Sequence, residues 1–140
     1  PLLAAAMVCA EGESSIEDVI FERRFGCAAG FERLGAKVQV NGRTLCIRPG
    51  GVLRGTELAA PDLRGGAALV VAALAASGTS VIGHPEHIDR GYAAFTEILS
   101  SLGAQIRREE RSRNPSAKKT SSKKQNHLAI GTKRWYDTVI

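Results

Sequence analysis

The chain contains an internal repeat that constrains its fold more than any single motif does. Residues 10–36 run from Ala-Glu-Gly-Glu-Ser-Ser-Ile to Leu-Gly-Ala, and residues 76–104 run from Ala-Ser-Gly-Thr-Ser-Val-Ile to Leu-Gly-Ala. In this alignment Arg24 falls on Arg90, and each arginine lies between a short apolar run and an amphipathic stretch. Such a repeat predicts two copies of one supersecondary unit that share a core. Packing needs only the apolar frame, so the repeated arginine indicates a binding site.

Apolar periodicity and capping residues predict an α/β chain with the order α-β-α-β-β, short strands, then α-β-α-β. A hairpin is expected around Asn41-Gly42, and Gly12 and Gly35 are expected to end the first two helices. Asp62 and Asp89 are expected to cap the last two. The predicted helices span residues 1–10, 22–34, 62–76 and 89–102, and the predicted strands span 14–17, 37–40, 44–48, part of 52–60, 79–82 and 104–108.

The second unit lacks the closing strand that the first unit has. An unpaired strand position exposes backbone donors and acceptors, so we expect it to be filled by a segment absent from this chain. The chain opens on Pro1 and not on methionine. Both features predict a piece of a longer protein.

Charge divides the chain into two parts at about residue 108. Residues 1–108 hold 11 basic and 11 acidic residues, whereas residues 109–140 hold 8 and 3 and so carry the whole net charge of +5. The body is neutral and is expected to form one domain. Residues 109–140 have no apolar period over most of their length and are expected to be a disordered basic tail.

Cysteine and histidine usage favours neither a disulfide framework nor a metal site. Cys9, Cys27 and Cys46 are odd in number and form no C-x-x-C pair, which is typical of free thiols in a reducing compartment such as the cytoplasm. Pro85 separates His84 from His87 and disfavours a shared helical face. The apolar run 67–76 is too short to cross a bilayer, which needs about 20 residues.

Three arginines occupy similar places: Arg24, Arg64 and Arg90 each fall in the first turn of a predicted helix. A helix N-terminus already carries positive potential, so an added guanidinium there favours an anionic partner. Three planar forks that converge suit a small dianion or trianion. The alternative is that adjacent carboxylates pair with these arginines as ordinary surface ion pairs: Glu22, Asp62 and Asp89.

Four motifs together resemble the C-terminal part of the enolpyruvyl transferases, and within them the UDP-N-acetylglucosamine 1-carboxyvinyltransferases. They are Ile-Phe-Glu-Arg-Arg-Phe at 20–25, Leu-Gly-Ala at 34–36, Asp-Leu-Arg at 62–64 and His-Ile-Asp-Arg-Gly-Tyr at 87–92. The last motif is the most specific. The resemblance covers residues 1–108 and implies less than two βαβαββ-like units of an inside-out α/β barrel, which the parent's own N-terminal segment completes.

The resemblance also implies a reaction and its site residues. The enolpyruvyl group of phosphoenolpyruvate is transferred to the 3-hydroxyl of UDP-N-acetylglucosamine, with release of phosphate and without metal or cofactor. Arg24, Arg64 and Arg90 would bind the carboxylate and phosphate of phosphoenolpyruvate. Arg90 and Asp62 are expected to be the catalytic residues, with Asp62 helping to hold the arginine cluster, and Ile20 would contact the nucleotide sugar through its backbone.

Departures from the family pattern and missing parts limit what the isolated chain can do. Family members usually have Asn in place of Arg23, His in place of Cys27 and Thr in place of Pro61. The family's reactive cysteine loop, its N-terminal lysine and the aspartate that serves the sugar hydroxyl all lie upstream. We therefore expect the chain alone to be inactive.

Two alternative functions remain open at this point. The related shikimate 3-phosphate enolpyruvyl transferases share the fold, although the motif at 87–92 argues against that substrate. A non-catalytic remnant whose basic tail binds nucleic acid or an acidic partner is the alternative from a different class.

Overall fold

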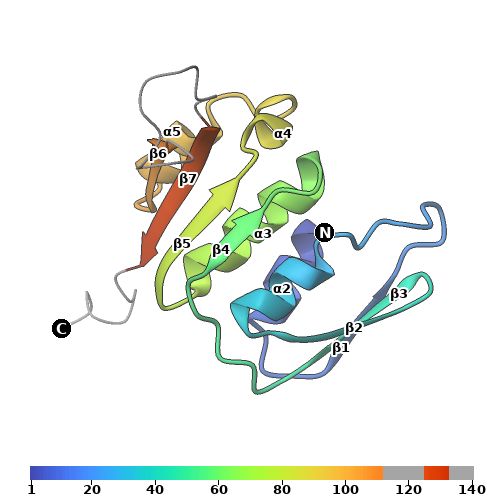
Figure 1. The fold of residues 1–140 in the computed structure, drawn as a ribbon. Helices are drawn as coiled ribbons and strands as arrows, with labels where there is room; N and C mark the ends of the chain where they lie inside the picture. The colour runs from blue at the N-terminus through green and yellow to red at the C-terminus, as the bar shows by residue number, and fades with distance from the viewer. Residues whose placement is uncertain (112–124, 133–140) are drawn as a thin grey trace, which may run out of the picture.

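The computed structural model describes the backbone of residues 1–111 and 125–132 (Figure 1). The helices are α1 Leu2–Val8, α2 Ala28–Leu34, α3 Leu63–Ala75, α4 Glu86–Asp89 and α5 Phe95–Ser101. The strands are β1 Ser14–Glu17, β2 Lys37–Asn41, β3 Thr44–Arg48, β4 Glu57–Ala59, β5 Gly78–Gly83, β6 Gln105–Arg111 and β7 Gln125–Thr132. They form a three-stranded sheet of order β1-β3-β2 and a four-stranded sheet of order β4-β5-β7-β6.

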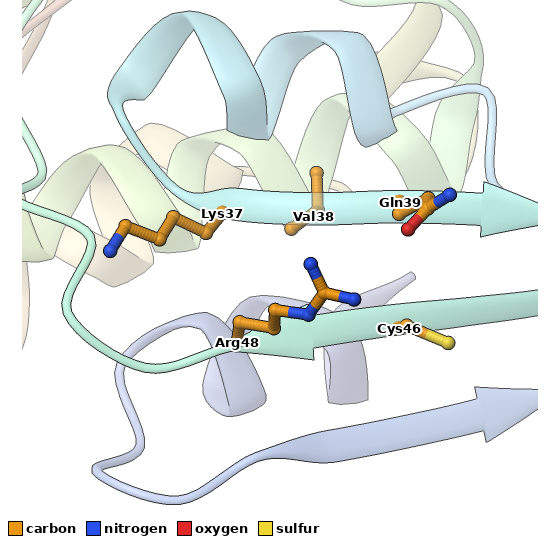
Figure 2. Close-up of a pocket in the computed structure, with 5 residues that line it drawn as sticks. All are labelled: Lys37, Val38, Gln39, Cys46 and Arg48. Atoms are coloured by element: carbon orange, nitrogen blue, oxygen red, sulfur yellow. The ribbon is translucent and has the colours of Figure 1, made fainter.

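The three-stranded sheet is built around the predicted hairpin. Asn41 pairs with Thr44, so the turn consists of Gly42 and Arg43, and Gly42 has the positive φ of +60° that such short turns favour. β1 then pairs antiparallel with β3. Residues of β2 and β3 line a hollow of about 300 Å³ (Figure 2): Lys37, Val38, Gln39, Cys46 and Arg48.

The four-stranded sheet is mixed. β4 runs parallel to β5, while β7 lies between β5 and β6 and is antiparallel to both. Gly55 lies just before β4 and approaches Thr79 so closely that an added Cβ would meet the Thr79 carbonyl oxygen at 2.3 Å. This approach keeps the start of β4 against β5.

The core lies where the central helices meet the two sheets (Figure 1). α3 contacts α1, α2, α4 and β7, and eight of its 13 residues are buried. α3 is apolar on nearly all sides, and it is exposed only at its two ends, at Arg64 in the first turn and at Ala75 in the last. A helix surrounded in this way holds its N-terminus in a fixed place.

Most predicted elements are confirmed, including the strand at 14–17, the hairpin, the capped helix after Asp62 and the strand at 79–82. The first helix is shorter than predicted, since it ends at Val8 with Cys9 as its C-cap and not at Gly12. Gly35 ends α2 as expected, with φ +102°.

Neither helix predicted at the repeated arginines starts where expected. Residues 22–27 form turns and α2 begins only at Ala28. Of the helix predicted over 89–102, α5 covers only 95–101, because Ala94 has φ +51° and cannot belong to a right-handed helix. Asp89 is therefore the last residue of α4 and caps no helix start.

The open strand position is filled from within the chain. We expected a segment absent from the chain, but β7 occupies the position between β5 and β6. The disorder predicted for 109–140 is therefore wrong for residues 125–132, which form this strand, and for residues 109–111, which end β6. Residues 112–124 and 133–140 of the predicted tail lie outside the described residues.

Candidate anion-binding site

Arg24 lies in the turn ahead of α2 and is held by Asp18, a partner that the sequence did not indicate. Its Nε donates to Asp18 Oδ2 at 2.9 Å, and both side chains are 20% exposed. Asp18 Oδ1 accepts the backbone N–H groups of Ile20 at 3.0 Å and Phe21 at 2.9 Å. These bonds fold the loop back on itself and explain why no helix forms at residue 22.

The same bonds tune the Asp18 carboxylate and leave part of Arg24 open. The Phe21 N–H and the Arg24 side chain lower the pKa of Asp18 to about 2. The guanidinium carbon of Arg24 lies 3.8 Å from the centre of the Phe21 ring, which adds a cation–π contact. Of the three guanidinium nitrogens of Arg24, only Nε has a hydrogen-bond partner among the described residues. Both Nη groups are therefore free to bind an anion.

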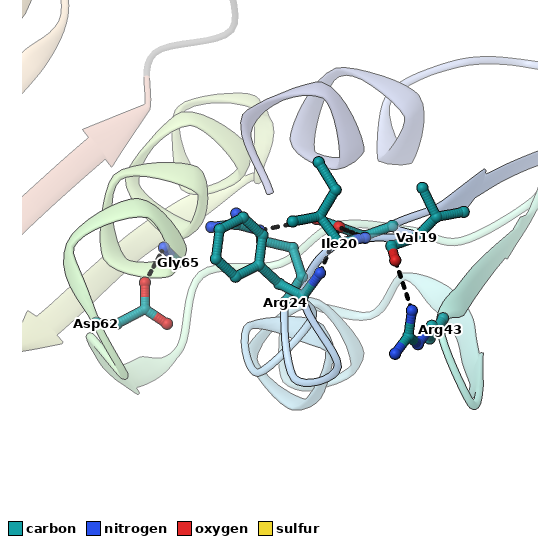
Figure 3. A network of polar contacts seen from close by, with 8 residues as sticks. Val19, Ile20, Arg24, Arg43, Asp62 and Gly65 are labelled. Atoms are coloured by element: carbon teal, nitrogen blue, oxygen red, sulfur yellow. Dashed lines mark hydrogen bonds and ion pairs between the residues drawn. The ribbon is translucent and has the colours of Figure 1, made fainter.

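Asp62 and Arg64 lie at the first turn of α3. Asp62 is extended, with φ −158°, and its Oδ1 accepts the N–H of Gly65 at 2.8 Å (Figure 3). This is the N-cap that the sequence predicted. Arg64 is exposed and, among residues 1–111 and 125–132, has no ion-pair partner. Its position at the positive end of α3 matches the expectation.

Arg90 lies beside this turn, on the segment that follows α4. Gly91 packs so closely that an added Cβ would lie 2.7 Å from the Leu63 side chain. An added Cβ on Gly66 would similarly lie 2.8 Å from Ile88. The two glycines thus let α4 approach the start of α3, and Arg90 and Arg64 extend from these two packed elements. Arg90 is the C-cap of α4, so its predicted place in a first helical turn is wrong.

The carboxylates that could have neutralised the three arginines bind elsewhere. Glu22 pairs with Arg43 at 3.2 Å, and Asp62 accepts the α3 backbone N–H. Asp89 accepts two bonds from Arg108, one of them 2.9 Å long. The ordinary ion pairs offered as the alternative are therefore not formed. Asp18 is the carboxylate that pairs with one of the three arginines.

Ile20 is 75% exposed, at the tip of the loop that Asp18 organises. Because its N–H is bonded to Asp18, the carbonyl is the backbone group left for a ligand. Figure 3 shows Ile20 and Val19 on this loop, and the Val19 carbonyl accepts a bond from Arg43. The loop is thus tied to the β2–β3 hairpin as well as to Arg24.

Cys27 and the two histidines of 84–87 have structural contacts. Cys27 is 1% exposed, and burial raises the pKa of its thiol, which disfavours the reactive thiolate. His87 Nδ1 lies 2.9 Å from the Ala60 carbonyl, and His84 Nδ1 lies 3.0 Å from Glu86. Within the described ranges no group of three or more metal-ligating side chains occurs. No helix among these residues is long and apolar enough to cross a membrane.

The positioning groups that sequence reasoning missed share one feature: they act through a loop conformation or a distant pairing. Asp18 precedes Arg24 by six residues, and an Asp directly after a short strand is a signal for such a turn. Arg108 reaches Asp89 only because β6 returns past α4, 19 residues later. No local sequence pattern could have predicted the contact between Arg108 and Asp89.

Comparison with known proteins identifies the family to which the chain belongs. A family model described as EPSP synthase (3-phosphoshikimate 1-carboxyvinyltransferase) matches residues 1–99, and the chain belongs to that family. The structure of the enolpyruvyl transferase NikO from Streptomyces tendae is similar, with a TM-score of 0.69 and 38% identity, over 75% of this chain and 25% of that one. EPSP synthase from Acinetobacter baumannii, at 16% identity and a TM-score of 0.53, shares the fold.

Among individual sequences, the resemblance to UDP-N-acetylglucosamine 1-carboxyvinyltransferases is confirmed. UDP-N-acetylglucosamine 1-carboxyvinyltransferase 2 of Caldanaerobacter subterraneus subsp. tengcongensis is 43% identical over 106 residues, which cover 76% of this chain and 25% of that enzyme. The protein of the same name from Listeria monocytogenes serotype 4b is 46% identical over the same share of each chain. The chain thus spans about a quarter of the length of these relatives.

Proposed function

We propose that this chain supplies part of the active site of an enzyme that transfers the enolpyruvyl group of phosphoenolpyruvate to the 3-hydroxyl of UDP-N-acetylglucosamine. The observation that carries the proposal is the set of open guanidinium groups. Arg24 keeps both Nη groups open, and Arg64 and Arg90 have no ion pair within the described residues. The names and identities of the relatives support this choice of substrates.

The proposed reaction requires cationic side chains that bind the carboxylate and phosphate of phosphoenolpyruvate, and it does not require a metal ion. The sugar 3-hydroxyl loses its proton as its oxygen adds to C2 of phosphoenolpyruvate, and C3 takes up a proton, so the C2–C3 double bond becomes single and C2 becomes tetrahedral. Loss of one proton from C3 and cleavage of the C2–O bond then release inorganic phosphate and yield the enol ether. Arg24, Arg64 and Arg90 would bind the carboxylate and phosphate and offset their charge as the intermediate forms.

Asp62 and Ile20 have supporting roles in this proposal. Asp62 holds the first turn of α3 through the Gly65 N–H, and so positions Arg64. The Ile20 carbonyl would accept a hydrogen bond from the nucleotide sugar. The remainder of a longer enzyme would supply the other substrate contacts, and the reaction would belong to peptidoglycan precursor synthesis in the cytoplasm.

The positions of Arg23, Cys27 and Pro61, where this chain departs from the family pattern, are compatible with this proposal. Arg23 is exposed and would add positive charge beside Arg24. Cys27 is buried beneath the start of α2 and is a packing residue. Pro61 is exposed, and an added Cβ on Gly65 would lie 2.9 Å from its ring, so it stiffens the entry to α3.

A chimeric enzyme tests the proposal. Residues 1–108 would replace the matching segment of the Listeria monocytogenes enzyme, and phosphate release would be measured with phosphoenolpyruvate and UDP-N-acetylglucosamine. We expect turnover from the chimera and none from the isolated chain. A folded but inactive chimera, or one that uses shikimate 3-phosphate in preference to the nucleotide sugar, would overturn the proposal.

Single substitutions in that chimera assign the site. Arg24→Ala, Arg64→Ala and Arg90→Ala should each lower kcat/KM by about 10²-fold or more, the cost of losing one donor to a developing anion. Arg33→Ala is the matched control, since Arg33 is an exposed arginine in the last turn of α2. Equal effects at Arg33 and at the three site arginines would contradict the assignment.

The charge asymmetry supports one alternative function. All of the net charge of +5 falls in residues 109–140, so this segment is a candidate for binding nucleic acid or an acidic partner. Retention of the chain on DNA or RNA at low salt, lost when residues 112–124 are replaced by a neutral linker, would support it. No retention at low salt would exclude it.

A further inference from the structure

In the four-stranded sheet, β7 lies between two strands that both precede it by many residues, β5 and β6. β7 pairs with β5 from Gly78↔Thr132 to Gly83↔His127, and with β6 from Gln105↔Gly131 to Arg111↔Gln125. β5 and β6 make no ladder with each other among the described strands. Each therefore depends on β7 for the backbone partners along one edge.

Side chains as well as backbone groups anchor β7. Leu128, Ala129 and Ile130 are 1%, 3% and 0% exposed. Ile130 pairs with Ile106 on β6, and Leu128 pairs with Ile82 on β5. β7 also contacts α3, the central helix of the core. The strand is thus a full member of the core.

β7 nevertheless lies outside the part of the chain that defines the family. The family model matches residues 1–99, and β7 begins 26 residues later, at Gln125. Thirteen residues, 112–124, separate β6 from β7, whereas two residues connect β2 to β3. A tight turn would set the register of a hairpin, so at β7 the pairing and the apolar side chains have to set it.

We propose that the space between β5 and β6 is a strand-binding site, and that β7 occupies it as a separable strand that needs no covalent connection to β6. The site recognises an extended peptide by antiparallel pairing on both sides. It selects two large apolar residues, here Leu128 and Ile130, on one face. Small residues, here Ala129 and Gly131, lie on the other face beside β5. This is strand addition, but into the middle of a sheet.

The experiment cuts the chain between β6 and β7. A recognition sequence for a specific protease is inserted into residues 112–124 of the full chain, and the folded protein is cleaved. We expect the two pieces to elute together in gel filtration, with an unchanged circular dichroism spectrum. Dissociation of the C-terminal piece, or unfolding on cleavage, would overturn the proposal.

Exchange with a synthetic peptide tests the selectivity of the site. A fluorescent peptide of residues 125–132 in excess should replace the cleaved strand, as followed by anisotropy. The same peptide with Ile130→Asp should compete at least 100-fold more weakly, whereas Asn126→Ala, at an exposed position, should compete as well as the unmodified peptide. Equal competition by the Ile130→Asp and unmodified peptides would overturn the proposal.

Discussion

The N-cap of α3 gives the prediction that can be developed most fully, because one bond connects stability to the candidate site. Asp62 is the only side chain that caps this 13-residue helix in the described structure, through its 2.8 Å bond from Gly65 N–H. Asp62→Ala removes the acceptor and leaves that N–H without its partner. Loss of such a cap costs about 1 kcal/mol, within a range of roughly 0.5 to 2.

Asp62→Asn separates the hydrogen bond from the charge. Asparagine caps about as well as aspartate, so this variant should lose less than about 0.5 kcal/mol. For a chain of this size, the loss of about 1 kcal/mol in Asp62→Ala corresponds to a decrease in Tm of roughly 3 to 5 °C. At the candidate site, both variants remove one negative charge beside Arg64.

Urea unfolding followed by circular dichroism at pH 7 measures these differences, and the m-value should stay constant. Glu11→Ala is the control, since Glu11 is exposed and, in the described part of the chain, has no ion pair. An unchanged midpoint in Asp62→Ala would refute the reasoning. So would equal losses in Asp62→Asn and Asp62→Ala, because the effect would then come from charge and not from the cap.

Three further predictions concern buried or paired groups. The Phe21 N–H and Arg24 depress the pKa of Asp18 to about 2 from its ordinary 3.8, so its stabilising contribution is present above about pH 4 and is lost as the pH falls towards 2. The urea midpoint should therefore fall more steeply between pH 4 and 2 in the parent than in Asp18→Asn; parallel curves would contradict this. Ser80 Oγ is buried without a hydrogen-bond partner among the described residues, so Ser80→Ala should raise the free energy of unfolding by about 1 kcal/mol, and a loss would contradict it. The buried Cys27 thiol, with its raised pKa, should react with iodoacetamide at pH 7.5 at least tenfold more slowly than in urea, as mass spectrometry of the labelled peptide would report, and equal rates would show that it is accessible.

Local patterns predicted the elements whose ends have local causes. The Asn41-Gly42 pair marked the hairpin, Asp62 marked the start of α3, and Gly35 marked the end of α2. In each case the deciding bond or backbone angle involves residues within four positions. Such features can be found in a single sequence because the chain carries both partners close together.

The predictions that failed depended on longer connections or on strain. The helix expected from residue 22 does not form there, because Asp18 organises a turn instead. The helix expected over 89–102 is interrupted at Ala94, which has a positive φ that alanine seldom takes. β7 pairs with strands that begin 20 or more residues away. The sequence before β7 is polar and rich in lysine, so it predicted disorder, although residues 128–130 are apolar and buried in the core.

The three arginines of the candidate site also differ in how firmly the protein holds them, and this difference affects the role that each could have. Arg24 is held through Nε by Asp18 and stacked on Phe21, so it would lose little freedom if its Nη groups bind the anion that we propose. Arg64 and Arg90 have no such anchor in the described structure, so in this proposal the ligand would have to order them. A lysine could replace the charge of either. It could not replace Arg24, because one ammonium group cannot bond Asp18 and present a planar fork to a carboxylate or phosphate at the same time.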